Sequence, residues 1–249
     1  MNTVLRCNDI LEVECESIMD LIESDGHLGG WHDDHHKHAA EAVWLSPAKE
    51  GIDLSIFKCL FSPGPNFANF FIEAGANNGI RQSNSFNAEI AYGCAGILVE
   101  PIKYNFLECR RYRPNSVCIN AVLGDHNGKI TGQFADELRN VRVENDNGLG
   151  AGCTQTHIGK YPELLKEVEM ITFKKLNAMF AVPERYAFLS LDVEGFEKMV
   201  INENSFSNHR PNTIMVETLD KTLEKTIIQQ GYKIWDRPND HDVIFKDIL

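Results

Sequence analysis

The sequence predicts an α/β fold, in which a mostly parallel sheet carries helices on both faces, ends in a C-terminal β-hairpin and follows a helical N-terminal segment. From residue 69 onward, short continuous apolar runs alternate with stretches of helical periodicity. Strands that are buried on both faces read as such runs, and their alternation with helices is typical of parallel sheets. With 249 residues, of which 43% are hydrophobic, the chain can bury a core without disulfides or a metal.

Each apolar run is expected to form one strand and each periodic stretch one helix. The predicted strands are residues 70–74, 96–100, 116–122, 187–193 and 213–217. The predicted helices between them are residues 83–92, 103–111, 195–202 and 220–230. Two further runs, 232–235 and 242–245, are separated by a polar turn and predict the terminal hairpin on the sheet edge.

Two regions lie outside this alternation. Residues 1–65 have an approximate helical rhythm and end in Ser-Pro-Gly-Pro, so they are expected to form a helical segment ahead of a domain at 66–249. Residues 124–185 form an insertion with a Gly-rich stretch and three candidate extra strands, at 129–134, 141–143 and 169–172. An insertion of this length is either a lid over a substrate or a surface loop.

Composition excludes several classes of function. The chain has 24 Lys and Arg against 36 Asp and Glu, a net charge of −12, which argues against a nucleic-acid partner. Seven cysteines without a CxxC pair are typical of a reduced intracellular protein. The acidic first twenty residues do not resemble a signal peptide, and no apolar stretch approaches the roughly 20 residues that span a bilayer. We therefore expect a cytoplasmic protein without a membrane partner, and the oligomeric state stays open.

Polar side chains stand at the carboxyl ends of the predicted strands: Glu73, Glu100, Asn120, Asp192 and Glu217. In open parallel sheets, ligands bind beyond these strand ends, where the strand order reverses. A single acidic strand end is easily a coincidence, whereas several in succession predict a ligand site.

The first of these strand ends continues into the turn EAGANNG at residues 73–79. Its glycines allow a tight turn and a close approach of backbone amides to a ligand. It lacks the G-x-G-x-x-G pattern that holds a pyrophosphate, and its carboxylate suits a cation or an amino group. Glu100 is placed to accept both hydroxyls of a ribose. A nucleoside with a positive group and no phosphate describes S-adenosylmethionine better than NAD.

At these residues the sequence resembles the FkbM family of S-adenosylmethionine-dependent methyltransferases. The resemblance rests on EAGANNG at 73–79, GILVEP at 96–101, LDVEGFE at 191–197 and MVE at 215–217, in this order over about residues 68–220. Ser83-Asn84 and Glu89 also match one subgroup of the family. The resemblance implies a Rossmann-like methyltransferase fold and an S-adenosylmethionine cofactor.

The resemblance also implies residue roles. The turn would line the methionine part with Glu73 near its amino group, Glu100 would hold the ribose, and Asn120 and Ala121 would flank the adenine. The implied cofactor-binding residues are Glu73, Gly75, Ala76, Asn77, Asn78, Ser83, Glu100, Pro101, Asn120, Ala121 and Asp192. The sequence departs from the family at Glu73, where Asp is commoner, at Asn78, where the subgroup has Asp, and at Cys94-Ala95, where the subgroup often has Trp.

The acids at the ends of the last two parallel strands are the candidate catalytic residues: Asp192, Glu194 and Glu217. Methyl transfer to a hydroxyl needs alignment and removal of a proton. Asp192 or Glu194 is the expected base. Carboxylates this close either share a proton or coordinate a hard cation such as Mg²⁺. In a structural alternative, Glu194 caps the following helix and Glu197 is solvated.

Histidines near the N-terminus are a separate feature. His32, His35 and His36 could share one helix face, with His38 turned away. A solvated polar face, a metal site and a substrate contact are all open, since segments ahead of the first strand commonly cover the substrate in this class. His157 and Tyr161 are weaker candidates for the same pocket.

The sequence therefore predicts a methyltransferase that O-methylates a hydroxyl of a sugar, glycan or other secondary metabolite. One rival is a catalytically silent cofactor-binding or scaffold domain, for which Asn78 is the one hint. A nicotinamide-dependent oxidoreductase is a second rival, and the missing G-x-G-x-x-G argues against it. The identity of the acceptor is not readable from fold and cofactor site.

Overall fold

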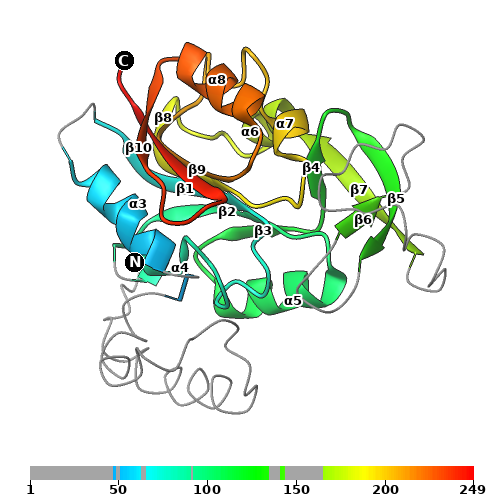
Figure 1. Cartoon of the computed structure of the whole chain (residues 1–249). Helices are drawn as coiled ribbons and strands as arrows, with labels where there is room; N and C mark the ends of the chain where they lie inside the picture. The colour runs from blue at the N-terminus through cyan, green and yellow to red at the C-terminus, as the bar shows by residue number, and fades with distance from the viewer. Residues whose placement is uncertain (1–46, 49–50, 63–65, 91, 135–140, 144–164) are drawn as a thin grey trace, which may run out of the picture. The chain divides into compact units, whose positions relative to one another are not determined.

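A computed structural model describes residues 47–48, 51–62, 66–90, 92–134, 141–143 and 165–249, and Figure 1 shows the arrangement of their helices and strands. The described strands form a seven-stranded sheet with the order β10-β11-β9-β8-β1-β2-β3 and a four-stranded sheet with the order β4-β7-β5-β6. The predicted α/β class is confirmed. Within the described residues, no helix is long and apolar enough to cross a membrane.

The larger sheet is parallel from β3 to β9. Its strands are β1 (Ala68–Ala74), β2 (Ala95–Val99), β3 (Val117–Ile119), β8 (Arg185–Leu191), β9 (Arg210–Glu217), β10 (Tyr232–Asp236) and β11 (Asp242–Asp247). From β1 the chain continues to β2 and β3 on one side, and it returns with β8 and β9 on the other. The strand order therefore reverses between β1 and β8, as in Rossmann-like folds, and a ligand crevice is expected at that point.

Successive residues of the central strands contribute to two apolar clusters, because side chains of a strand alternate between the faces of the sheet. On β8, Phe188 belongs to one cluster and Leu189 to the other. The Phe188 face is covered by α3 (Ile52–Leu60), α4 (Phe86–Ile90) and α5 (Lys103–Tyr112), and the Leu189 face by α6 (Phe173–Met179), α7 (Glu197–Val200) and α8 (Lys221–Gln229). Figure 1 shows both helical layers. The sequence pattern grouped α3 with residues 1–65, but its buried side chains pack on the sheet.

The predicted C-terminal hairpin is confirmed, since β10 and β11 pair antiparallel. β11 also pairs with β9, so it lies inside the sheet and β10 forms the edge. The side chains follow this arrangement, because all of β11 is buried while the middle of β10 is exposed.

The predicted strand at 116–122 is wrong as one element. The structure divides it into β3 in the larger sheet and β4 (Val122–Gly124) in the smaller one. Between them, the side-chain amide of Asn120 donates to the carbonyl oxygens of Glu100 (2.9 Å) and Pro101 (2.8 Å). This anchoring draws the chain toward the end of β2 and ends the ladder that β3 forms with that strand.

The smaller sheet arises from the insertion. Its other strands are β5 (Gly128–Phe134), β6 (Val141–Val143) and β7 (Leu165–Thr172), which confirms the candidate extra strands. Val122 and Met170 pack on Phe196 and on half-buried Ile102, residues that follow β8 and β2. The sheet thus supports two loops at the strand ends. The Gly-rich stretch, His157 and Tyr161 lie outside the described residues, as do the histidines at 32–38, so the lid and the substrate-covering segment stay predictions.

The helix expected at 83–92 is shortened to α4 (Phe86–Ile90), and two further helices also differ from the sequence prediction. The helix expected at 195–202 is only four residues long as α7, because Glu194 (φ 54°) and Gly195 (φ 100°) are left-handed and Ile201 is extended. Helix α6 has no counterpart among the predicted elements. Its N-cap is Thr172, whose side chain accepts a hydrogen bond from the Lys175 amide.

Candidate functional site

The acids predicted to form a site are brought to one edge of the larger sheet. Glu73 is the penultimate residue of β1, Glu100 directly follows β2, Asp192 follows β8 and Glu217 ends β9. Two backbone bonds join these strand ends, from the Asp192 amide to Ala74 O (3.0 Å) and from the Gly75 amide to Val99 O (3.0 Å). The arrangement follows from parallel pairing, which places the carboxyl ends of neighbouring strands together.

Gly75 can only be glycine in this structure. Its φ is +84°, and a Cβ built on it would lie 1.8 Å from the carbonyl oxygen of Asp192. The turn after β1 therefore runs directly against the backbone at the end of β8. Buried Ala76 follows in the same turn. This close approach fixes the distance between the turn after β1 and the end of β8, where the strand order reverses.

Asn77 and Asn78 shape the rest of the turn. The Asn77 amide donates to Glu100 Oε2 at 2.9 Å. The Asn78 side-chain oxygen accepts from the amides of Ile80 (3.1 Å) and Arg81 (2.8 Å). Aspartate and asparagine both make such turn bonds. The amide at position 78 thus fulfils a local structural role that the subgroup's aspartate would also fulfil.

Glu73 is buried and holds the segment that leads into α4. One carboxylate oxygen accepts from the Ser83 hydroxyl (2.8 Å) and the Ser85 hydroxyl (2.5 Å), and the other accepts from the Asn84 amide (2.6 Å). Burial raises the pKa of Glu73, while the charge of Arg113 and these hydrogen bonds lower it. The buried carboxylate thus holds residues 83–85, which lead into α4, in one conformation. Its expected contact with an amino group of a cofactor stays a prediction.

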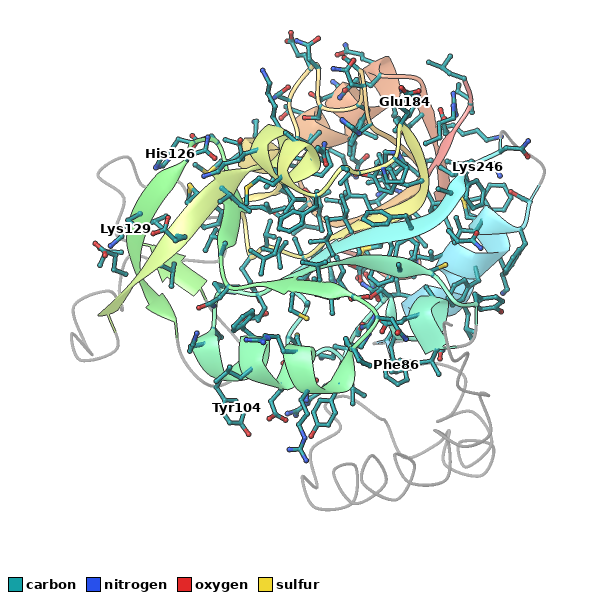
Figure 2. All side chains as sticks on the ribbon, turned by 180° about the vertical axis from the view of Figure 1, so that it is seen from behind. Phe86, Tyr104, His126, Lys129, Glu184 and Lys246 are labelled. Atoms are coloured by element: carbon teal, nitrogen blue, oxygen red, sulfur yellow. The ribbon has the colours of Figure 1, made fainter. Side chains whose placement is uncertain are left out.

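Arg113, directly after α5, is the centre of this network and was missed from the sequence. It is fully buried and pairs with Glu89 at 2.8 Å. Its guanidinium also donates to Gly79 O (2.8 Å), to the Ser83 hydroxyl (3.1 Å) and to both oxygens of Ser85. The guanidinium lies over the rings of Phe71 and Phe86, the latter labelled in Figure 2. No local signal distinguishes Arg113 from its exposed neighbours Arg110 and Arg111.

Glu100 is a buried acid whose two oxygens have separate partners. Oε2 accepts the Asn77 amide, and Oε1 accepts the Ile102 amide at 2.8 Å. Burial raises its pKa to about 7, against the lowering effect of these bonds and of Asn105. Asn120 binds the neighbouring carbonyls, and Ala121 is buried in the core. Glu100, which is expected to accept hydrogen bonds from the ribose hydroxyls, is thus held between the turn after β1 and the link between β3 and β4.

Asp192 lies beside Glu217 at the ends of β8 and β9. Burial raises the pKa of Asp192 well above its ordinary range, and hydrogen bonding to Glu217 and the charges of Glu217, Glu194 and Glu197 raise it further. Its Oδ1 is buried and has no hydrogen-bond partner among the described residues. Two facing carboxyl groups without a donor need a proton or a cation between them.

The structural alternative for the acids after β8 is wrong for Glu197. That residue is buried, and its Oε1 accepts the amides of Val193 (3.0 Å) and Gly195 (3.2 Å). Phe196 is the N-cap of α7 and makes no side-chain cap hydrogen bond, and a capping role for Glu194 stays a prediction. Glu197 instead closes the loop in which Glu194 adopts its left-handed backbone. The sequence motif LDVEGFE thus encodes a tight loop beside Asp192.

The chain matches one family model and is similar to several solved structures. The model of the methyltransferase FkbM domain matches residues 73–235. Among solved structures, the chain is similar to methyltransferase FkbM from Methylobacillus flagellatus KT, with 14% identity and a TM-score of 0.45, over 74% of this chain and 45% of that one. It thus spans less than half of that relative. A search of curated protein sequences finds no significant match.

Two further solved structures are also similar to the chain. Precorrin-6y C5,15-methyltransferase from Geobacter metallireducens GS-15 has 10% identity and a TM-score of 0.37, over 78% of this chain and 85% of that one. A fibrillarin/Nop5p complex has 12% identity and a TM-score of 0.32, over 82% of this chain and 80% of that one.

Replacing Arg113 by methionine is expected to destabilise the protein by about 3–5 kcal/mol, because Glu73 and Glu89 lose their buried countercharge. Denaturant unfolding followed by circular dichroism measures the change. Arg111→Met, on the exposed end of α5, is the matched control and should shift stability by less than about 0.5 kcal/mol. Similar effects of the two substitutions would contradict the central role of Arg113.

Glu100→Gln is expected to change the pH dependence of stability. Because the folded pKa of Glu100 is raised from 4.5 to about 7, its protonated form stabilises the fold below pH 4.5, and this contribution is lost as pH rises to about 7. The loss amounts to about 3 kcal/mol. Unfolding free energies at pH 5 and pH 8 should therefore differ more in the wild type than in Glu100→Gln, and parallel curves would show that Glu100 titrates normally.

Proposed function

We propose that this chain, which belongs to the family of methyltransferase FkbM domains, transfers the methyl group of S-adenosylmethionine to a hydroxyl of a sugar, glycan or other secondary metabolite. The family model covers more than half of the chain and includes every strand end of the site. Methyl transfer follows from the family, and the cofactor contacts and the hydroxyl acceptor are the proposal. A small molecule or glycan is a suitable partner for a chain with a net charge of −12.

One observation carries the cofactor part of the proposal: the buried carboxylate of Glu100 is bound to the glycine turn through the Asn77 amide. A fixed carboxylate at this strand end suits the two hydroxyls of a ribose. Gly75, Ala76, Asn77 and Asn78 would line the methionine part, where the absence of a Cβ at Gly75 preserves the close approach to β8. Ser83 orders this turn through Glu73, and Pro101, Asn120 and Ala121 would flank the base.

The same residues fit S-adenosylmethionine better than a dinucleotide. The turn after β1 carries an acid, and neighbouring Asp192 has a buried carboxyl oxygen that no group of the described residues donates to. Such an environment favours a positively charged ligand and disfavours a pyrophosphate. When bound, S-adenosylmethionine supplies a methyl group on a good leaving group, so the protein needs to align the acceptor and remove its proton.

Asp192 is the proposed general base, with Glu194 as the alternative. A carboxyl group whose pKa is raised is a stronger base than an ordinary carboxylate, and base catalysis is most effective near the working pH. Glu217 would position this base, because it contacts Asp192 from the neighbouring strand. Assistance by Mg²⁺ bound to these carboxylates stays a prediction.

A catalytically silent cofactor-binding domain is the second candidate. Its one hint was the asparagine at position 78, which in the structure accepts two backbone amides of its own turn. That local role explains the residue without a loss of activity. An active methyltransferase is therefore favoured over a catalytically silent domain, and a measurement of methyl transfer distinguishes the two.

Isothermal titration calorimetry is expected to show micromolar binding of S-adenosylmethionine and of its demethylated product, but not of NAD. Glu100→Gln should weaken that binding at least about tenfold, because a hydrogen bond to a charged group contributes about 1.5–3 kcal/mol. The matched control is Glu184→Gln, an exposed acid at the opposite end of β8 (Figure 2). Absence of binding to the folded wild type would contradict the cofactor assignment.

Asp192→Asn is expected to lower methyl transfer by at least about 100-fold, because general-base catalysis contributes at least that factor. Its affinity for S-adenosylmethionine should change only severalfold. The acceptor is first identified in a screen of hydroxyl compounds that follows formation of the demethylated product. Full turnover by the variant would remove Asp192 from the mechanism, and absence of turnover with every acceptor in the wild type would favour the silent domain.

A further inference from the structure

The end of β9 and the start of β11 bring together three groups that the sequence pattern did not connect. Asp242 is directly opposite Glu217 in the antiparallel ladder, and His241 precedes it. His241 Nε2 lies 3.7 Å from Glu217 Oε1 and 3.8 Å from Asp242 Oδ2. One potential ligand atom from each residue lies within 4.8 Å of the other two. Ligand atoms about 2.1 Å from one metal ion are roughly 3.0–4.2 Å apart, so small rotations of half-buried Glu217 and His241 complete such a site.

The neighbouring carboxyl group of Asp192 points to a cation independently. Asp192 follows Leu191, which pairs with Val216, so it lies beside Glu217, and its buried Oδ1 has no hydrogen-bond partner within the described part of the chain. Across the same residues, no lysine or arginine forms an ion pair with Asp192 or Glu217. An uncompensated buried carboxylate is costly, and a bound cation removes that cost.

The ligands are also held in place by a surrounding network. The side chain of Asn239 accepts hydrogen bonds from the amides of His241 (3.0 Å) and Asp242 (2.7 Å) and donates to Asp242 Oδ2 (2.6 Å). The His241 carbonyl accepts the Thr218 amide at 2.6 Å. Outer partners of this kind orient the ligands of metal sites.

We propose that Glu217, His241 and Asp242 form a binding site for a divalent transition-metal ion, with Asp192 beside it. The imidazole distinguishes this site from an all-oxygen site for Mg²⁺ or Ca²⁺. A set of one imidazole and two carboxylates suits divalent transition metals such as Mn²⁺ and Co²⁺. The ligand set differs from the Asp192, Glu194 and Glu217 cluster expected from the sequence. The proposal does not depend on methyl transfer, because metal binding needs neither a cofactor nor an acceptor.

The test titrates the full chain, freed of metal with a chelator that is then removed, with MnCl₂ and MgCl₂ in a calorimeter. We expect one saturable Mn²⁺ site, with an affinity at least about tenfold above that for Mg²⁺. Co²⁺ should give visible absorption bands that change when the imidazole ligand is removed. Binding of S-adenosylmethionine is measured on the same preparation. If the protein binds S-adenosylmethionine but not Mn²⁺, the metal site is wrong and the proposed function is unaffected.

His241→Ala and Glu217→Gln are each expected to weaken Mn²⁺ binding at least about tenfold. His126→Ala is the matched control, since His126 also lies beside an acid, Asp125, but on an exposed turn (Figure 2). No saturable Mn²⁺ binding by the wild type, or equal affinities in the wild type and His241→Ala, would overturn the proposal. Should Glu217→Gln fail to fold, His241→Ala decides alone, because its side chain is half-buried and the strand pairing uses only its backbone.

Discussion

The buried guanidinium of Arg113 is the interaction on which the turn after β1 depends. Its positive charge lowers the pKa of Glu73, and its five donors are shared among the Glu89 carboxylate, two serine hydroxyls and two backbone carbonyls. A charge without water costs several kcal/mol unless such bonds are complete. Because they are complete, β1, the segment before α4 and the end of α5 are held in one arrangement, and the glycine turn has a rigid support.

The turn after β1 lies so close to the end of β8 that the turn and the acids after β8 form one rigid unit. Gly75 leaves no room for a side chain against Asp192, so the turn and the acids after β8 cannot move independently. The smaller sheet adds to this rigidity, since Val122 and Met170 pack on the loops that follow β2 and β8. A cofactor held by Glu100 would therefore lie at a set distance from Asp192, as methyl transfer requires.

Several carboxyl groups gather at the ends of β8 and β9 and the start of β11. Asp192 directly follows β8, Glu217 ends β9 and Asp242 begins β11, and Glu197 is buried close by. Burial and the charges of neighbouring acids raise the pKa of Asp192 and of Glu197. One cluster can thus support both proposals, a base for the acceptor hydroxyl and a metal site that includes His241.

The sequence by itself determined the fold class, most of the parallel strands, the terminal hairpin and the acids at the strand ends, because continuous apolar runs and glycine turns are local signals. Only the tertiary structure decided which polar residues meet. Arg113 is one of several arginines near the end of α5, and His241 lies in a polar hairpin turn, so neither is marked locally. The break at Asn120 depends on its contacts with the end of β2, and the shortened α7 depends on the tight loop that follows Asp192. Such contacts override local propensity because their energy comes from groups distant in the chain.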